Sequence, residues 1–176
     1  MEEERVVLLL GLQYSGKSMF ADYMFDGSFH EYTPTVRFKE IPLGGDLLLV
    51  EYGGTVVKSW KALFKNSPYR GRVFKVLLFV DGSFDECLLE ETRSVYLSML
   101  YYFKELQEVP LCVVQHNATA DDAPAQSWKR VKEKLQLRLL LQRGFCSGKI
   151  LVIRLVYSEP DALQKNTERI LQWIIH

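Results

Sequence analysis

The segment RVVLLLGLQYSGKS at residues 5–18 constrains the fold more than any other part of the chain. Residues 6–10 form a short apolar run that ends at a glycine, which is typical of a buried strand. Residues 17–25 have the pattern of a helix that begins directly after the second glycine of the segment. A strand that leads through a glycine loop into a helix is the first half of a βα unit, and such units build parallel sheets.

Apolar runs alternate with longer amphipathic segments along the rest of the chain. We predict further strands at residues 36–42, 47–51, 74–80, 111–114 and 150–156, with LGGD as the hairpin turn between the first two. We predict further helices at residues 85–107, 126–142 and 162–174. The expected fold is therefore α/β: a six-stranded, mostly parallel sheet with one antiparallel edge strand and helices on both faces.

Length, composition and charge exclude several classes of protein. The 176 residues predict one domain, and 48% apolar residues are typical of a globular protein. A formal net charge of zero argues against a nucleic-acid partner. No apolar run is long enough to span a bilayer, and neither end has a signal or lipidation motif, so we expect no direct membrane anchor. Cys87, Cys112 and Cys146 are expected to be reduced core residues of a cytoplasmic protein.

The sequence GLQYSGKS matches the phosphate-binding loop of P-loop NTPases. In such a loop, glycines let the backbone wrap a phosphate, while inward amides and the end of a helix supply positive potential. Lys17 is expected near the β- and γ-phosphates, and Ser18 is expected to bind Mg²⁺. The nucleotide-binding residues predicted from this segment are Gly11, Gln13, Tyr14, Ser15, Gly16, Lys17, Ser18 and Met19.

Four further motifs follow in a fixed order: YTPTVRF at 32–38, LLLVEYGG at 47–54, WKALFKN at 60–66 and LLFVDGS at 77–83. Together with the phosphate loop, they resemble the motifs of Arf-like small GTPases of the Ras superfamily. The resemblance implies a Ras-like G domain over residues 1–176 that binds GTP or GDP with Mg²⁺. It also implies a molecular switch that recruits protein effectors and regulators through residues 27–37 and 53–66.

The resemblance assigns further roles around the nucleotide. It places the Thr35 hydroxyl on Mg²⁺ and the γ-phosphate, and it places Glu51 where the family has an aspartate that acts on Mg²⁺ through a water. It implies that Gly54 donates its N–H to the γ-phosphate. For the base it implies three residues: Asn117, Asp121 and the backbone of Tyr157.

Several residues depart from the family pattern. Thr55 replaces the catalytic glutamine that orients the attacking water, so intrinsic hydrolysis is expected to be very slow. The base-recognition motif Asn-Lys-x-Asp is reduced to HNATADD at 116–122. Glu51 and the short spacing from Gly54 to Trp60 are similar to one divergent branch, that of the Arf-like protein numbered sixteen. The resemblance to that branch implies a role in intracellular traffic, including traffic at cilia.

Two other functions remain open on the sequence. In the first, the chain is a pseudo-GTPase docking module with little or no nucleotide turnover. In the second, it is a small phosphotransferase, with Asp81 on Mg²⁺ and a lid arginine at Arg138 or Arg143. His116, at the end of a predicted strand, either contacts the nucleotide or packs in the core.

Overall fold

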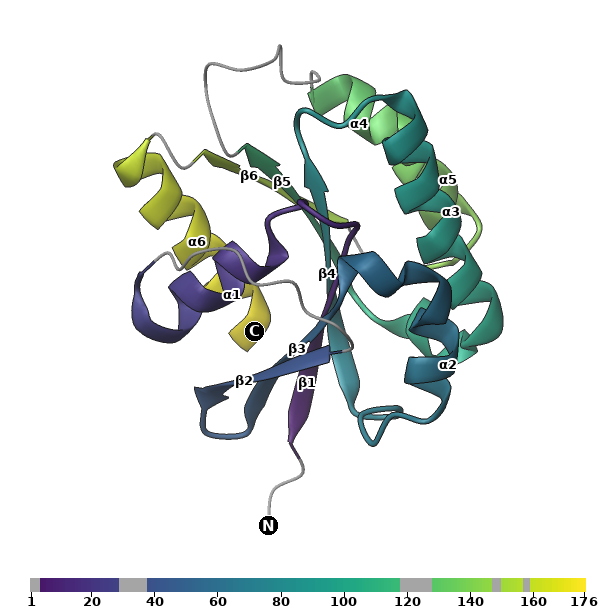
Figure 1. Ribbon diagram of the computed structural model, residues 1–176, viewed down its shortest axis with the longest axis horizontal. Helices are drawn as coiled ribbons and strands as arrows, with labels where there is room; N and C mark the ends of the chain where they lie inside the picture. The colour runs from purple at the N-terminus through teal and green to yellow at the C-terminus, as the bar shows by residue number, and fades with distance from the viewer. Residues whose placement is uncertain (1–3, 29–37, 118–127, 147–149, 157–158) are drawn as a thin grey trace.

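The computed structural model describes residues 4–28, 38–117, 128–146, 150–156 and 159–176. Six strands form one sheet in the order β2-β3-β1-β4-β5-β6 (Figure 1). The strands are β1 (Arg5–Leu10), β2 (Phe38–Gly44), β3 (Leu47–Tyr52), β4 (Val73–Asp81), β5 (Leu111–Asn117) and β6 (Leu151–Val156). The helices are α1 (Lys17–Asp26), α2 (Trp60–Lys65), α3 (Glu86–Tyr102), α4 (Trp128–Lys134), α5 (Leu137–Gln142) and α6 (Pro160–Ile175), with 3₁₀ segments η1 (Gly54–Ser59) and η2 (Lys104–Glu108).

The pairing of the strands confirms the predicted fold class. β2 and β3 are antiparallel, whereas β3, β1, β4, β5 and β6 pair in parallel. Leu8 of β1 lies between Val50 of β3 and Val76 of β4 in this register. The carboxyl ends of the parallel strands therefore meet at one edge of the sheet, which is where α/β sheets bind ligands.

Helices cover both faces of the sheet (Figure 1), and the central strands β1, β3 and β4 are mostly buried, whereas most of the edge strand β2 is exposed. Side chains of a strand alternate between the faces, so Val7 and Leu9 pack in the cluster that contains Phe20 of α1 and Ile170 of α6. Their neighbours Val6 and Leu8 pack in the cluster on the face that α2, α3, α4 and α5 cover. Burial on both faces explains why β1 is an unbroken apolar run.

Two predicted helices differ from the structure. The helix expected at 85–107 ends at Tyr102, because Phe103 leaves the helical region with φ −126° and ψ 89° and η2 follows. The helix expected at 126–142 is two helices within its described part, because Gln136 is left-handed with φ 53° and ψ 40°. Neither break is marked by glycine or proline, so the amphipathic pattern continues through both of them.

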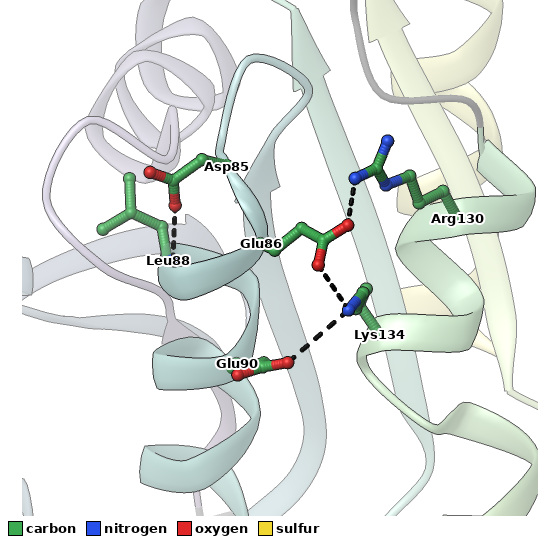
Figure 2. Close-up of polar contacts among 6 residues, drawn as sticks. All are labelled: Asp85, Glu86, Leu88, Glu90, Arg130 and Lys134. Carbon is green, nitrogen blue, oxygen red and sulfur yellow. Dashed lines mark hydrogen bonds and ion pairs between the residues drawn. The ribbon is translucent and has the colours of Figure 1, made fainter.

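Ionic contacts connect the beginning of α3 to α4 (Figure 2). Asp85 caps α3 by accepting a hydrogen bond from the Leu88 amide at 2.8 Å. Glu86 accepts hydrogen bonds from Lys134 at 2.7 Å and from Arg130. The Lys134 ammonium, and next the Arg130 guanidinium, lower the pKa of the Glu86 carboxyl. These exposed contacts orient α4, the first described element after residues 118–127.

The cysteines are free thiols, as predicted, but one of them is not in the core. Cys112 of β5 and Cys146 are buried, whereas Cys87 is exposed near the beginning of α3. The expectation that all three are core residues is therefore wrong for Cys87. None of the helices in the described ranges is long and apolar enough to cross a membrane.

Candidate functional site

A cavity of about 330 Å³ lies at the carboxyl edge of the sheet. Its walls come from the segment after β1 with the beginning of α1, from the ends of β3, β4 and β5, and from the segments that follow β3 and β4. The lining residues are Gln13, Tyr14, Ser15, Gly16, Lys17, Ser18, Met19, Glu51, Gly54, Asp81, Ser83, Phe84 and His116. This volume is within the range of small-molecule sites, and the location is the one that α/β sheets use for ligands.

The predicted phosphate loop forms one wall of the cavity. Gly16 has φ 87°, which an L side chain rarely adopts, and a Cβ at this position would lie 2.3 Å from the His116 ring. Glycine is therefore required at position 16 both by conformation and by space. Gly16 is also the N-cap of α1 and has no side-chain capping bond, so the first turn of α1 presents its amides at the cavity wall.

One amide of the loop differs from the inward-facing amides expected of a phosphate loop. The Ser15 amide donates to the Leu12 carbonyl oxygen at 3.3 Å, so it takes part in a turn within the loop. Tyr14, just before it, has a positive φ of 63° and an exposed side chain. A turn within the loop therefore uses the Ser15 amide as a hydrogen-bond donor.

The Lys17 side chain is buried against its own loop. Its ammonium donates to the carbonyl oxygens of Gly11 at 2.8 Å and Leu12 at 3.1 Å, and to Ser15 Oγ at 3.3 Å. Only 4% of Lys17 is exposed, and burial lowers its pKa to about 8, although the charge of Glu51 opposes this shift. The structure thus holds a cation at the wall of the cavity, as phosphate binding requires.

Ser18 of α1 and Glu51 of β3 form a polar contact with each other at the wall of the cavity. Ser18 Oγ donates to Glu51 Oε1 at 2.7 Å. Glu51 is 1% exposed, and its second carboxylate oxygen, Oε2, is buried without a hydrogen-bond partner. Hydroxyl and carboxylate oxygens are the ligands that Mg²⁺ prefers, so the residues present fit such a cation.

Gly54 brings the segment after β3 into contact with the phosphate loop. A Cβ at Gly54 would lie 2.3 Å from the Gln13 amide nitrogen and 2.4 Å from the Leu12 carbonyl carbon. Trp60 stabilises the turn at Gly53 and Gly54. Its side chain is 1% exposed, and its indole N–H donates to the Gly53 carbonyl oxygen at 2.9 Å. The phosphate loop and η1 therefore pack directly against each other.

The far wall contains a buried histidine and an aspartate. His116 Nε2 lies 3.6 Å from Asp81 Oδ2, and the His116 ring packs on Gly16. Burial lowers the pKa of His116 to about 4, although the Asp81 carboxylate opposes this shift. Asp81 also accepts hydrogen bonds from the amide and hydroxyl of Ser83, the amide at 2.7 Å. At neutral pH the His116 side chain is thus a neutral imidazole at the wall of the cavity.

The structure brings together most of the residues predicted from the phosphate loop and the Glu-x-Gly-Gly motif. Those that line the cavity are Gln13, Tyr14, Ser15, Gly16, Lys17, Ser18, Met19, Glu51 and Gly54. Gly11 lies behind the loop and accepts a hydrogen bond from Lys17. Thr55 is exposed and does not line the cavity.

The remaining predicted residues are at or beyond the limits of the described structure. Thr35, Asp121 and Tyr157 lie outside the described residues. Asn117 is the last residue of β5, and the structure describes its backbone only. Two lining residues, Ser83 and Phe84, were missed by the sequence analysis, whereas His116 and Asp81 were considered there and left open. The signal that could have found all four is that each lies at or directly after the end of a predicted strand.

No protein-family model matches the chain. Its fold is similar to that of the Arl6 (BBS3) small GTPase from Trypanosoma brucei, solved with the bound nucleotide analogue GppNp. That similarity has a TM-score of 0.68 at 20% identity and covers 97% of this chain and 94% of the other. The mammalian SRP receptor structure matches with a TM-score of 0.65 at 17% identity, covering 85% of this chain and 90% of the other. At these identities the comparisons establish the P-loop NTPase fold of small GTPases for this chain.

Proposed function

We propose that the chain is a guanine-nucleotide switch of the Arf-like type, folded as one G domain over residues 1–176. The observation that carries this proposal is the convergence of residues 13–19, Glu51 and Gly54 on a single cavity, with the buried ammonium of Lys17 at its wall. The fold shared with small GTPases supports it, because the cavity lies where the phosphate loop of this fold binds nucleotide.

Each phosphate contact in this proposal can be assigned to residues of the chain. The amides in the first turn of α1 and the Lys17 ammonium would bind the β- and γ-phosphate oxygens. Phosphate oxygens would replace the carbonyl oxygens of Gly11 and Leu12 as partners of Lys17. Ser18 and Glu51 would hold Mg²⁺, and Thr35 would add its hydroxyl. When bound, Mg²⁺ neutralises charge between the β- and γ-phosphates.

The switch would act through the contact between Gly54 and the phosphate loop. An amide donated by Gly54 to the γ-phosphate would stabilise η1 in one position, and Trp60 would transmit that position to α2. Residues 27–37 and 53–66 would then form the surface that binds protein effectors and regulators. A nucleotide can shift such a surface only if it contacts one arrangement better than the other.

Intrinsic hydrolysis of GTP would be slow in this proposal. Thr55, which stands where the family has its catalytic glutamine, is exposed and is not a lining residue. A threonine also lacks the amide that orients an attacking water. Turnover would therefore require a partner protein that supplies the missing group.

Recognition of the base would involve Asn117, Asp121 and the backbone of Tyr157. His116 supports nucleotide binding from the other side, because its neutral ring packs on Gly16 of the phosphate loop. We infer that His116 helps to position this loop, which is a role that the sequence left open.

The first alternative is a pseudo-GTPase docking module. One observation favours it: the hydrogen bonds of the Lys17 ammonium are satisfied by its own loop. Against it stands the buried oxygen of Glu51, which lacks a partner at the same cavity. The phosphotransferase alternative has less support, because Arg138 and Arg143 are exposed at α5 and do not line the cavity.

The purified chain tests this proposal. Acid precipitation should release GTP or GDP, identified by ion-exchange chromatography, and GTP with Mg²⁺ should raise the melting temperature of nucleotide-free protein. Lys17→Ala should abolish nucleotide retention, whereas Lys129→Ala, which changes an exposed lysine on α4, should retain it. Equal GTP affinity in the two variants would contradict the proposal, and absence of any nucleotide effect on wild type would favour the docking module.

The cellular part of the proposal follows from the resemblance to Arf-like proteins and to the branch numbered sixteen. We propose a cytoplasmic protein that serves intracellular traffic, including traffic at cilia, through its protein partners. A tagged full-length chain in ciliated cells tests this: accumulation at the cilium base or shaft is expected for wild type and lost in Lys17→Ala.

A further inference from the structure

Glu51 is a buried carboxylate whose charge is only partly compensated in the structure. Oε1 accepts a hydrogen bond from Ser18, and Oε2 is buried with no partner. Removing a carboxylate from water without pairing it costs several kcal/mol, even after the surrounding protein relaxes. Because Glu51 also lines the cavity, its uncompensated oxygen indicates a missing ligand.

The neighbouring lysines do not supply that ligand. The hydrogen-bond donors of Lys17 go to Gly11, Leu12 and Ser15. Lys39 lies opposite Glu51 across the β2–β3 pair, but its ammonium lies 2.6 Å from Asp22 of α1. Among the described residues, neither cation forms a salt bridge with Glu51.

Ser18 and Glu51 both line the cavity and already contact each other through Ser18 Oγ and Glu51 Oε1. A serine hydroxyl can donate its proton to Glu51 Oε1 while its lone pairs bind a cation. Oε2 belongs to the same carboxylate, so it lies close to Ser18 Oγ. The glutamate arm is also longer than that of an aspartate by one methylene, or about 1.5 Å, which removes part of the space for a bridging water.

We propose that Glu51 binds the divalent cation directly through Oε2, next to Ser18 Oγ, rather than through a water molecule. This inference rests on the proposed function, because the cation would arrive with the nucleotide. Direct binding would displace one water from the cation. It would also link β3 to α1, because Glu51 and Ser18 would bind the same ion. The affinity for the cation should consequently depend on the charge and the length of this side chain.

The test uses the full chain with GTP and Mn²⁺, which replaces Mg²⁺ and is visible to electron paramagnetic resonance. Line broadening in ¹⁷O-water counts the water molecules on Mn²⁺. Wild type should show one water fewer than Glu51→Asp, and Glu51→Gln should bind Mn²⁺ tenfold or more weakly. Glu40→Asp, the same substitution at an exposed position of β2, should keep the wild-type count.

A second measurement uses wild type alone, so its result does not depend on whether the Glu51 variants fold. Protein labelled with ¹³C at the glutamate δ-carbon should show a strong Mn²⁺–¹³C coupling if the carboxylate binds directly. Equal water counts in wild type and Glu51→Asp, or no such coupling, would overturn direct binding while leaving the switch intact. Failure of wild type to bind GTP with Mn²⁺ would overturn the proposed function and this inference together.

Discussion

Gly54, in the segment after β3, lies directly against the backbone of the phosphate loop. We predict that Gly54→Ala destabilises the protein by about 1–3 kcal/mol, because its Cβ would overlap the Gln13 amide nitrogen at 2.3 Å. Movement of η1 to relieve this overlap should also weaken GTP binding at least tenfold, by about 1.4 kcal/mol. Urea unfolding and nucleotide titration measure the two effects.

Gly71→Ala is the matched control for that substitution. Gly71 has φ 89°, but a Cβ there would meet nothing within 4 Å. The control should cost about 1–2 kcal/mol through the left-handed backbone alone, and it should leave GTP affinity unchanged. A similar loss of affinity in both variants would show that the close contact at Gly54 has no special role.

His116 should make the stability of the protein depend on pH. Burial lowers its pKa from 6.5 in the unfolded chain to about 4 in the folded one. Between these values the unfolded chain binds more protons, so the free energy of unfolding falls as the pH falls from 6.5 towards 4. Between about pH 7 and about pH 4.5, wild type should lose on the order of 2 kcal/mol more than His116→Asn, measured by urea unfolding. Parallel stability curves for the two proteins would contradict this.

At the residue scale, the sequence predicts the part of the site that is local in the chain. The spacing of Gly11, Gly16 and Lys17 is enough to predict a phosphate loop, because one turn and one helix end build it. The contact of His116 with Gly16 depends on how β5 is positioned across the sheet. A pattern within the chain does not contain that information.

At the scale of single elements, the break between α4 and α5 offers a direct test. Gln136 has φ 53°, a conformation that costs a non-glycine residue roughly 1–2 kcal/mol. Gln136→Gly should remove this cost but add about 0.5–1 kcal/mol of chain-entropy cost, so we predict a stabilisation of up to about 1.5 kcal/mol. Thermal unfolding of the two proteins measures the difference.

Gly144 provides the reverse substitution in the same region. Its φ is 68°, and an added Cβ would meet no atom within 4 Å, so only the backbone opposes a side chain. Gly144→Ala should therefore destabilise the protein while Gln136→Gly stabilises it. The same sign for both substitutions would rule out the left-handed backbone as the cause.

The elements that the sequence predicts best are those with a single strong pattern. β1 and β4 are apolar on both faces, and their predicted positions agree with the structure to within one residue at each end. The breaks at Phe103 and Gln136 were missed, because neither carries a local signal that ends a helix. Phe103 packs on Phe64 of α2 with ring centroids 4.7 Å apart, and that contact is absent from any local pattern.

At the scale of the whole molecule, the fold follows from the alternation of buried strands and amphipathic helices. Right-handed βα crossovers leave few possible strand orders once one hairpin is placed at the edge. The same topology brings four separate segments of the chain to one cavity, as the lining residues from 13–19, 51–54, 81–84 and His116 show. A ligand in this cavity therefore contacts both halves of the sheet.

That arrangement predicts how nucleotide should affect the entire fold. GTP with Mg²⁺ at about a hundred times its dissociation constant should add about 2.7 kcal/mol to the free energy of unfolding. For a chain of this length the melting temperature should then rise by roughly 5–11 °C. Because the cavity is lined by the loop after β1 and by the ends of β3, β4 and β5, amide hydrogen exchange should slow in all four strands together. Protection confined to residues 11–18 would instead show that the loop binds phosphate without coupling to the sheet, and a switch could not work through such a site.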